Sequence, residues 1–322
     1  MSHAHPHISR RHFCLCSLSA AAFTATGGWL TPREAFAEAR GLVSLLKDHA
    51  AVAPIVTYSL RGNISILEGS GGNIAVLTGR DGKVLIDAGI RASMPNLTKA
   101  LDALGPDPVA HLINTHWHFD HSDGNEWLHS VGAKILSQTN TRKYLSQVQR
   151  VEDWDYNFLP LGAGGIPDEV FEAERGLSLN GATINLKHYG SAHTDSDIYA
   201  HFAEADVLHT GDTFWNGIYP FIDYSTGGSI DGMIAASNVN LALATEKTII
   251  VPGHGHPISN RRELQDFHDM LVGIRDKVAA LKKEGMSRDE TVAAKPTAAF
   301  DDRYGKFVID PGFFTRLVYE GV

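Results

Sequence analysis

The segment Thr115-His-Trp-His-Phe-Asp-His121 most restricts how this chain can fold. It follows directly on Val109 to Asn114, which the residue pattern predicts to be a buried strand. Because side chains alternate along an extended segment, the first two histidines share one side, and a turn lets the last two polar residues address a neighbouring position. Imidazole is the commonest metal-binding side chain, so this segment predicts a metal site that can serve two ions. Its candidate ligands are His116, His118, Asp120 and His121.

Three further candidate ligands follow predicted strands in the same way. They are His193 in Gly190-Ser-Ala-His-Thr-Asp, Asp212 in His209-Thr-Gly-Asp-Thr, and His254 in Pro252-Gly-His-Gly. Taken alone, each is weak, because a lone histidine in a glycine-rich loop is more often structural than a ligand. Their shared position at strand exits makes the seven residues one candidate site.

Short strands and helices alternate along the rest of the sequence, which predicts a single α/β domain. Asp153 to Pro167 is predicted to be a long loop bordering the site, and Ser287 to Val322 a short helix with an irregular closing segment. The predicted strands are Val56–Leu60, Ile64–Leu67, Ile74–Thr78, Val84–Ile86, Val109–Asn114, Lys134–Leu136, Ala182–Tyr189, Ile198–Phe202, Val207–His209 and Thr248–Val251. The predicted helices are Asn96–Leu104, Asn125–Val131, Thr139–Val151, Ile230–Ala244 and Glu263–Lys283.

These motifs resemble those of the metallo-β-lactamase superfamily. The order in that family is an aspartate after a strand, His-x-His-x-Asp-His, a later histidine, a bridging aspartate and a final histidine. Here Asp87 in Leu85-Ile-Asp-Ala-Gly precedes the cluster, and His193, Asp212 and His254 follow it. The resemblance covers roughly residues 55–257. It implies a four-layer αββα sandwich of the α/β class, with two sheets face to face, helices outside, and the site along one edge.

The resemblance also assigns the ligands. One metal ion would be held by His116, His118 and His193, and the other by Asp120, His121 and His254, with Asp212 bridging. Five imidazoles and two carboxylates suit two Zn²⁺ ions per chain, and iron and manganese stay open. Zinc lowers the pKa of a bound water, so a metal-bridging hydroxide would be the nucleophile and Asp120 the catalytic residue that orients it and shuttles its proton.

The bond that is cleaved depends on Asp212. In carrying an aspartate at this place of the motif order, the chain resembles thioesterases of the glyoxalase II type and lactonases. This resemblance implies hydrolysis of an ester, thioester, lactone or amide of a small molecule. A dedicated β-lactamase is the first alternative. The second is an iron-dependent dioxygenase of the same fold, since the superfamily also includes such enzymes. Fold alone does not decide among these activities.

For several residues near the candidate ligands, the sequence allows two roles. Asp87 either bonds the His116 loop or a ligating imidazole, or caps a turn. The aromatic residues either form an apolar wall for a substrate or belong to the core. They are Trp117, Phe119, Phe214, Trp215, Tyr219 and Phe221.

Residues 1–37 are predicted to be a twin-arginine signal peptide. Ser9-Arg10-Arg11-His12-Phe13 precedes an uncharged stretch, and Ala35-Phe36-Ala37 is a small-residue cleavage pattern. The mature domain would then span residues 38–322, with a motif core (55–257) and a C-terminal helical extension (258–322). We expect a periplasmic or secreted protein without stable membrane insertion. Cleavage would also remove both cysteines, Cys14 and Cys16, which excludes a cysteine ligand.

The formal net charge of −9 argues against a general nucleic-acid binder, which would normally display a basic face. A small-molecule substrate is the expected partner. The sequence leaves the oligomeric state open.

Overall fold

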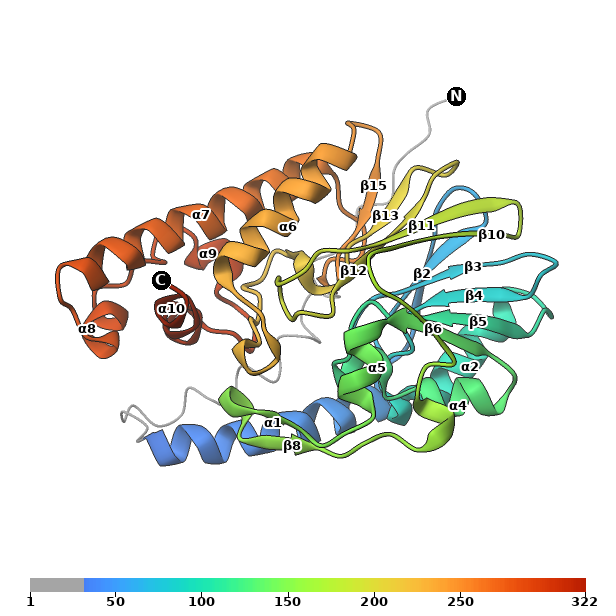
Figure 1. Cartoon of the computed structure of the whole chain (residues 1–322), viewed down its shortest axis with the longest axis horizontal. Helices are drawn as coiled ribbons and strands as arrows, with labels where there is room; N and C mark the ends of the chain where they lie inside the picture. Colours follow the sequence, from blue (N-terminus) through green and yellow to red (C-terminus); the bar gives the residue numbers. More distant parts are fainter. Residues whose placement is uncertain (1–31) are drawn as a thin grey trace, which may run out of the picture.

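Strands that are apolar on both faces must be covered on both faces, and both sheets of this chain are covered. The computed structural model describes the backbone of residues 32–322 and the side chains from residue 41 onward. A seven-stranded and a five-stranded sheet pack against each other, with helices outside (Figure 1). The predicted αββα sandwich is confirmed.

The larger sheet combines an antiparallel and a parallel half. Its first four strands form an antiparallel meander. The remaining neighbours pair in parallel, which requires crossover connections. In spatial order the strands are β1 (Val56–Ser59), β2 (Ile64–Glu68), β3 (Ile74–Leu77), β4 (Lys83–Ile86), β5 (Val109–Ile113), β6 (Lys134–Gln138) and β9 (Glu169–Phe171).

The smaller sheet is antiparallel except for its last pair. In spatial order its strands are β10 (Glu174–Leu179), β11 (Ala182–His188), β12 (Ile198–Phe202), β13 (Val207–His209) and β15 (Ile249–Val251). Two short pairs lie outside the sheets: β7 (Gln149–Val151) with β8 (Tyr156–Phe158), and β14 (Trp215–Asn216) with β16 (His254–Gly255).

Alternation along the strands gives the larger sheet an inner and an outer apolar face. Ile66 of β2 and Ile86 of β4 meet Leu186 and Phe202 of the smaller sheet in the core between the sheets. The opposite face of the larger sheet carries side chains such as Leu85, which pack under α2 (Met94–Ala103) and α4 (Asn125–Ser130).

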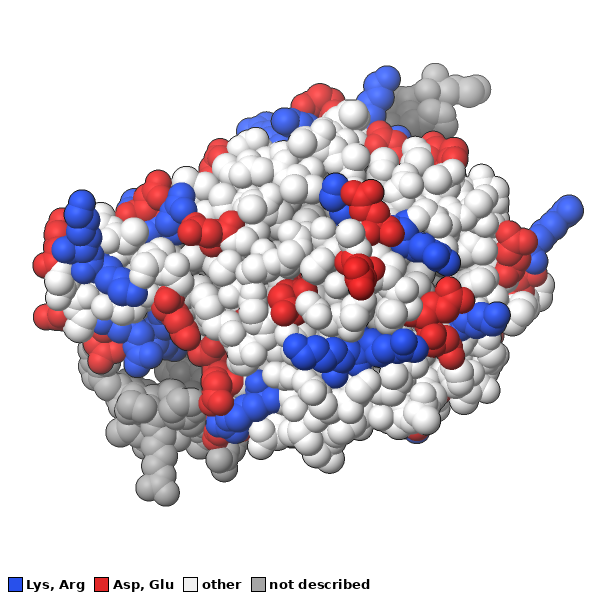
Figure 2. Space-filling view, in the orientation of Figure 1, with Lys and Arg blue, Asp and Glu red and all other residues white. Residues whose placement is uncertain are grey.

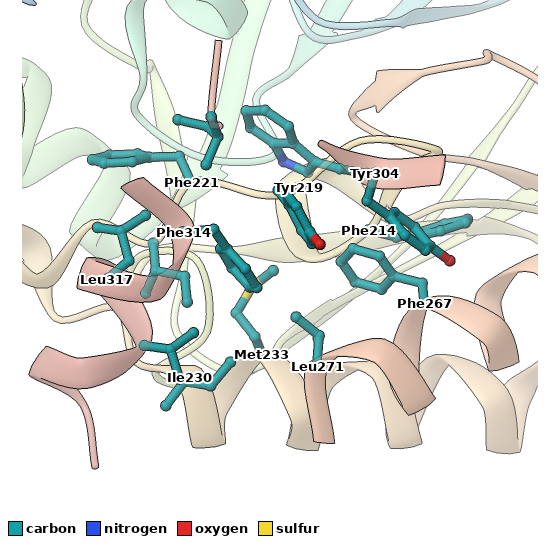
Figure 3. Packing of buried hydrophobic residues seen from close by; sticks show 14 of the residues in the cluster. Phe214, Tyr219, Phe221, Ile230, Met233, Phe267, Leu271, Tyr304, Phe314 and Leu317 are labelled. Atoms are coloured by element: carbon teal, nitrogen blue, oxygen red, sulfur yellow. The ribbon is translucent and has the colours of Figure 1, made fainter. Parts of the chain in front are cut away.

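Helices from the second half of the chain cover the smaller sheet (Figure 1). Figure 3 shows how Phe214 and Tyr219 pack among Met233, Phe267 and Phe314, which come from three different helices. The C-terminal region therefore shares one hydrophobic cluster with the segment after Asp212. The helices are α6 (Ile230–Leu243), α7 (Arg261–Lys283), α8 (Arg288–Ala293), α9 (Asp301–Tyr304) and α10 (Pro311–Glu320).

Three sequence predictions need correction. Helix α5 spans only Thr139–Leu145, because the chain then forms the hairpin of β7 and β8, with Val151 buried inside it. The predicted loop Asp153 to Pro167 consequently contains a strand. The strands β9 and β10 lack the alternation that would have revealed them, since β10 is a largely exposed edge. The tail holds three helices in place of one, and Asp310-Pro311 begins the last of them with a side-chain cap.

The N-terminal helix α1 (Pro32–Val52) packs against two 3-10 turns, η1 (Arg91–Ser93) and η2 (Glu152–Trp154). Residues 1–31 of the predicted signal peptide lie outside the described residues, and the predicted cleavage point after Ala37 falls within α1. Among the helices that the structure describes, none combines the length and apolarity needed to cross a bilayer.

Acidic and basic side chains are interspersed over the face shown in Figure 2. The expectation that the chain does not bind nucleic acid stays a prediction.

The packing of α10 predicts that Leu317→Ala destabilises the fold by about 2–5 kcal/mol, because Leu317 is fully buried and its removal leaves a cavity. Leu159→Ala is the control, since Leu159 is 75% exposed and should change the free energy of unfolding by less than about 0.5 kcal/mol. Urea denaturation followed by circular dichroism measures both. Equal effects of the two variants would show that α10 is not part of the core.

Candidate metal centre

The seven predicted ligands converge at one edge of the sandwich. His116 and His118 follow β5, and the short helix α3 (Phe119–Ser122) presents Asp120 and His121. The other three come from loops of the smaller sheet, after β11, β13 and β15. Their ligand atoms form two groups, each within 4.8 Å: His116, His118, His193 and Asp212, and then Asp120, His121 and His254.

The first group contains two imidazole nitrogens that face each other without a proton between them. His118 Nε2 donates to Asp223 Oδ2 (3.0 Å), and His193 Nδ1 donates to the carbonyl of Phe221 (2.7 Å). In the neutral rings this leaves lone pairs on His118 Nδ1 and His193 Nε2, which lie 2.8 Å apart. A cation between them removes the repulsion of the two lone pairs, so the donor set fits a metal ion.

His116 points a third lone pair into the same group. Thr115 Oγ1 donates to Asp87 Oδ2 (2.8 Å), so it accepts from His116 Nδ1 (3.0 Å). The other ring nitrogen, Nε2, is buried and has no hydrogen-bond partner among the described residues. A buried polar atom without a partner is costly, and a metal ion would satisfy it.

The second group is built on a carboxylate network. His121 Nδ1 donates to Asp87 Oδ2 (2.7 Å), which directs its Nε2 toward His254 Nε2 (3.2 Å). His254 Nε2 also lies 3.0 Å from Asp120 Oδ2. The side chains of Asp120 and His254 are 12% exposed, so this group is the accessible side of the centre.

Asp212 lies within reach of both groups. Its Oδ2 is 3.5 Å from His193 Nε2 and 3.3 Å from His254 Nε2, and its Oδ1 is 3.1 Å from His121 Nε2. One carboxylate thus contacts donors of both groups, which is the geometry expected of a bridging ligand.

Burial and charge divide the histidines into two kinds. Desolvation, with the neighbouring imidazoles, holds the pKa of His116 well below its usual range and lowers that of His193 to about 4. Burial alone would also lower the pKa values of His121 and His254, but Asp212 and Asp120 outweigh it. The pKa of His121 rises well above its usual range and that of His254 rises to about 9. His116 and His193 are therefore neutral at pH 7, and His121 and His254 are protonated when no ion replaces their protons.

Burial would raise the pKa values of the two carboxylates, but the neighbouring histidines reverse its effect. The pKa of Asp120 falls to about 2 and that of Asp212 falls well below its usual range. Both carboxylates are ionised at neutral pH.

Two glycines allow the backbone to approach the centre closely. A Cβ at Gly72 would overlap the ring of His121, and a Cβ at Gly253 would overlap Asp212 Oδ1. These positions exclude every other residue unless the ligands move.

Of the two interpretations of Asp87, the structure supports the one that binds the loop and the imidazole. Besides His121 and the Thr115 hydroxyl, Asp87 accepts from the Thr115 backbone N–H (2.7 Å). Asp223 was missed from the sequence, because it lies 105 residues from His118 and no local pattern marks it.

The predicted aromatic residues are all buried, but they differ in what they contact. Phe214 and Tyr219 belong to the helical core. Trp117, Trp215 and Phe221 lie against the rings of candidate ligands, with centroid distances of 4.6 Å to His118, 4.3 Å to His254 and 6.0 Å to His193. Phe214 and Tyr219 are therefore core residues, as one interpretation of the sequence predicted. Trp117, Trp215 and Phe221 border the site.

The four-layer sandwich with a histidine and aspartate cluster at one sheet edge defines a class of metal-binding proteins. The chain belongs to the metallo-beta-lactamase superfamily, whose family model matches residues 67–257.

Sequence relatives of the chain include two uncharacterised mycobacterial proteins. One, from Mycobacterium leprae (strain TN), is 29% identical over 203 residues, which span 59% of this chain and 88% of the relative. Another, from Mycobacterium tuberculosis (strain H37Rv), is 27% identical over 208 residues, with the same coverage.

Solved structures share the fold at low identity. A metallo-beta-lactamase from Pontibacter korlensis superposes with a TM-score of 0.55 at 18% identity, covering 68% of this chain and 99% of its own. The sec-alkylsulfatase Pisa1 from Pseudomonas sp. superposes with a TM-score of 0.62 at 16% identity and covers 89% of this chain. This chain spans only about half (52%) of the alkylsulfatase.

The contact between Asp223 and His118 predicts that Asp223→Asn weakens metal binding by about 10- to 100-fold, because the amide no longer supports the imidazole with a charge. Competition with a chromophoric chelator measures the affinity. Asp231→Asn is the control, since Asp231 pairs with Arg275 on the surface. Equal affinities in both variants would contradict the assigned role of Asp223.

The raised pKa of His254 predicts that metal binding releases protons. Because that pKa is about 9 in the metal-free chain, His254 is protonated at pH 7 and a binding ion must displace its proton. As the pH rises through 9, fewer chains carry this proton, so fewer protons are released per ion bound. Calorimetric titration of zinc in two buffers of different ionisation enthalpy counts the protons released. If almost no protons were released at pH 7, the protonated state assigned to His254 would be wrong.

Proposed function

We propose that the mature chain is a dinuclear metallohydrolase that cleaves an ester, thioester, lactone or amide bond of a small molecule. The single observation that carries this proposal is the position of Asp212 within 3.5 Å of donors in both ligand groups. A site for one structural ion would be a closed tetrahedron and would not need a second donor set.

The residues of the chain divide the work of holding the ions. His116, His118 and His193 would hold one, and Asp120, His121 and His254 the other, with Asp212 shared. The donor chemistry suits Zn²⁺. When bound, such ions supply Lewis acidity and lower the pKa of a coordinated water.

Asp120 is the candidate catalytic residue. Its pKa of about 2 keeps it ionised. Its side chain is 12% exposed, whereas that of Asp212 is 2% exposed. It can therefore accept a hydrogen bond from a water at the mouth of the centre, orient that water, and take its proton.

The proposed substrate is a small molecule, and the proposed location is the periplasm or the outside of the cell, reached by the twin-arginine route. β-Lactam hydrolysis and iron-dependent dioxygenation are the competing activities. The fold shared with a sec-alkylsulfatase adds sulfuric esters to the esters to be tested.

Metal analysis of the purified protein tests the proposal first, and we expect about two zinc ions per chain. One iron per chain with oxygen consumption would support the dioxygenase instead. Turnover is then measured on thioester, lactone, carboxylic ester, sulfuric ester and β-lactam substrates.

We expect His118→Ala to lower turnover at least about 100-fold, because it removes a donor that no neighbouring side chain replaces. The control His129→Ala should retain wild-type turnover, since His129 lies on α4 with a 42% exposed side chain. Equal loss in both variants, or turnover that survives a chelator, would refute a metal-dependent hydrolase.

A further inference from the structure

Two tryptophans beside the metal centre carry indole N–H groups that have no hydrogen-bond partner among the described residues. Trp154 and Trp215 are 7% and 5% exposed. The Nε1 atom of each is buried, and within the described part of the chain nothing accepts a hydrogen bond from it. Leaving a buried donor unsatisfied costs roughly 1–3 kcal/mol, so each of the two requires an explanation.

Trp215 lies over the accessible side of the centre. Its ring is 4.3 Å from the ring of His254 and 6.3 Å from that of His193, measured between centroids. It is held there by β14, which pairs with β16, the strand that begins at His254. The ring of Phe307, which is only partly buried, lies 6.5 Å from that of Trp215 between centroids.

Trp154 belongs to the turn η2 and lies beside the other ligand group. Its ring stacks on Phe221 (4.8 Å) and lies 5.6 Å from His118. Its other neighbours include Phe119, which precedes Asp120 in sequence, and the partly exposed Phe158. The half-buried rings of Phe158 and Phe307 thus lie beside the two indoles and pack against the same hydrophobic cluster.

A third indole beside the centre does have a hydrogen-bond partner. Trp117 touches His118 as well, yet its Nε1 donates to Thr226 Oγ1 at 3.1 Å. Among the described residues, the fold therefore supplies an acceptor to the indole of Trp117 and none to those of Trp154 and Trp215.

We propose that Trp154 and Trp215 are substrate-binding residues whose indole N–H groups donate to the oxygen atoms of an apolar ester bound at the metal centre. The aromatic rings around them take the apolar group of the substrate, and the polar head lies toward the ligands. This proposal rests on the proposed hydrolase function and narrows its substrates to apolar esters, among which carboxylic and sulfuric esters present the same acceptor oxygens.

Octanoate is the probe, because it combines an oxyanion with an apolar chain and cannot be turned over as an ester. The zinc-loaded protein, labelled with ¹⁵N in its indoles, is titrated with octanoate and observed by NMR. Trp154→Phe and Trp215→Phe assign the two resonances and keep the aromatic rings. Acetate and 1-octanol are titrated in parallel, since each lacks one half of the probe.

We expect octanoate to move both indole N–H resonances downfield, and each Trp→Phe variant to weaken its binding about tenfold. The control Trp127→Phe, on α4 beneath the larger sheet, should bind octanoate like the wild type. Octyl sulfate in place of octanoate distinguishes the two ester classes by which anion binds more tightly.

Binding of octanoate without movement of the two resonances, equal affinity in all three variants, or no binding at millimolar concentration would each overturn the proposal. Elemental analysis of the same samples reports separately on the proposed function. If the wild-type sample contains two zinc ions per chain but octanoate does not move the two indole resonances, this inference is wrong and the proposed hydrolase function is unaffected.

Discussion

The buried carboxylate of Asp87 is the interaction on which the site depends. It stands directly after β4 in the left-handed region (φ 70°) and accepts three hydrogen bonds of 2.7–2.8 Å. Two come from Thr115 and fix the loop after the neighbouring strand β5, and the third comes from His121. Because a buried charge is costly unless it is fully bonded, these donors are locked to the carboxylate. One aspartate thus sets the positions of ligands in both groups.

Three other imidazoles are also each held by a hydrogen bond to one ring nitrogen. His116 is held through Thr115, His118 through Asp223, and His193 through the carbonyl of Phe221. In each ring the bonded nitrogen carries the proton and the other nitrogen faces the centre, so the fold selects the tautomers before an ion binds. Asp212 then joins the two groups, because its loop and that of His254 follow the adjacent strands β13 and β15.

The parts of the structure that were predictable from sequence are those encoded locally. The ligands sit at the ends of apolar strands, so strand prediction and residue type together made all seven one candidate site. The resemblance to the metallo-β-lactamase superfamily placed that site at one edge of the sandwich. The long-range partners were not predictable, since Asp223 reaches His118 only through the folding of an intervening sheet. The exposed edge strand β10 and the tail helix α10 were also missed. The first lacks an apolar alternation, and the second was missed although Asp310 and Pro311 mark its start.

The central claim is that two metal ions share Asp212. The most direct test is anomalous diffraction from crystals of the purified protein, recorded on both sides of the zinc absorption edge. We expect two anomalous peaks per chain, one among His116, His118 and His193 and one among Asp120, His121 and His254, with Asp212 between them. A single peak, or a signal that appears only at the iron edge, would contradict it.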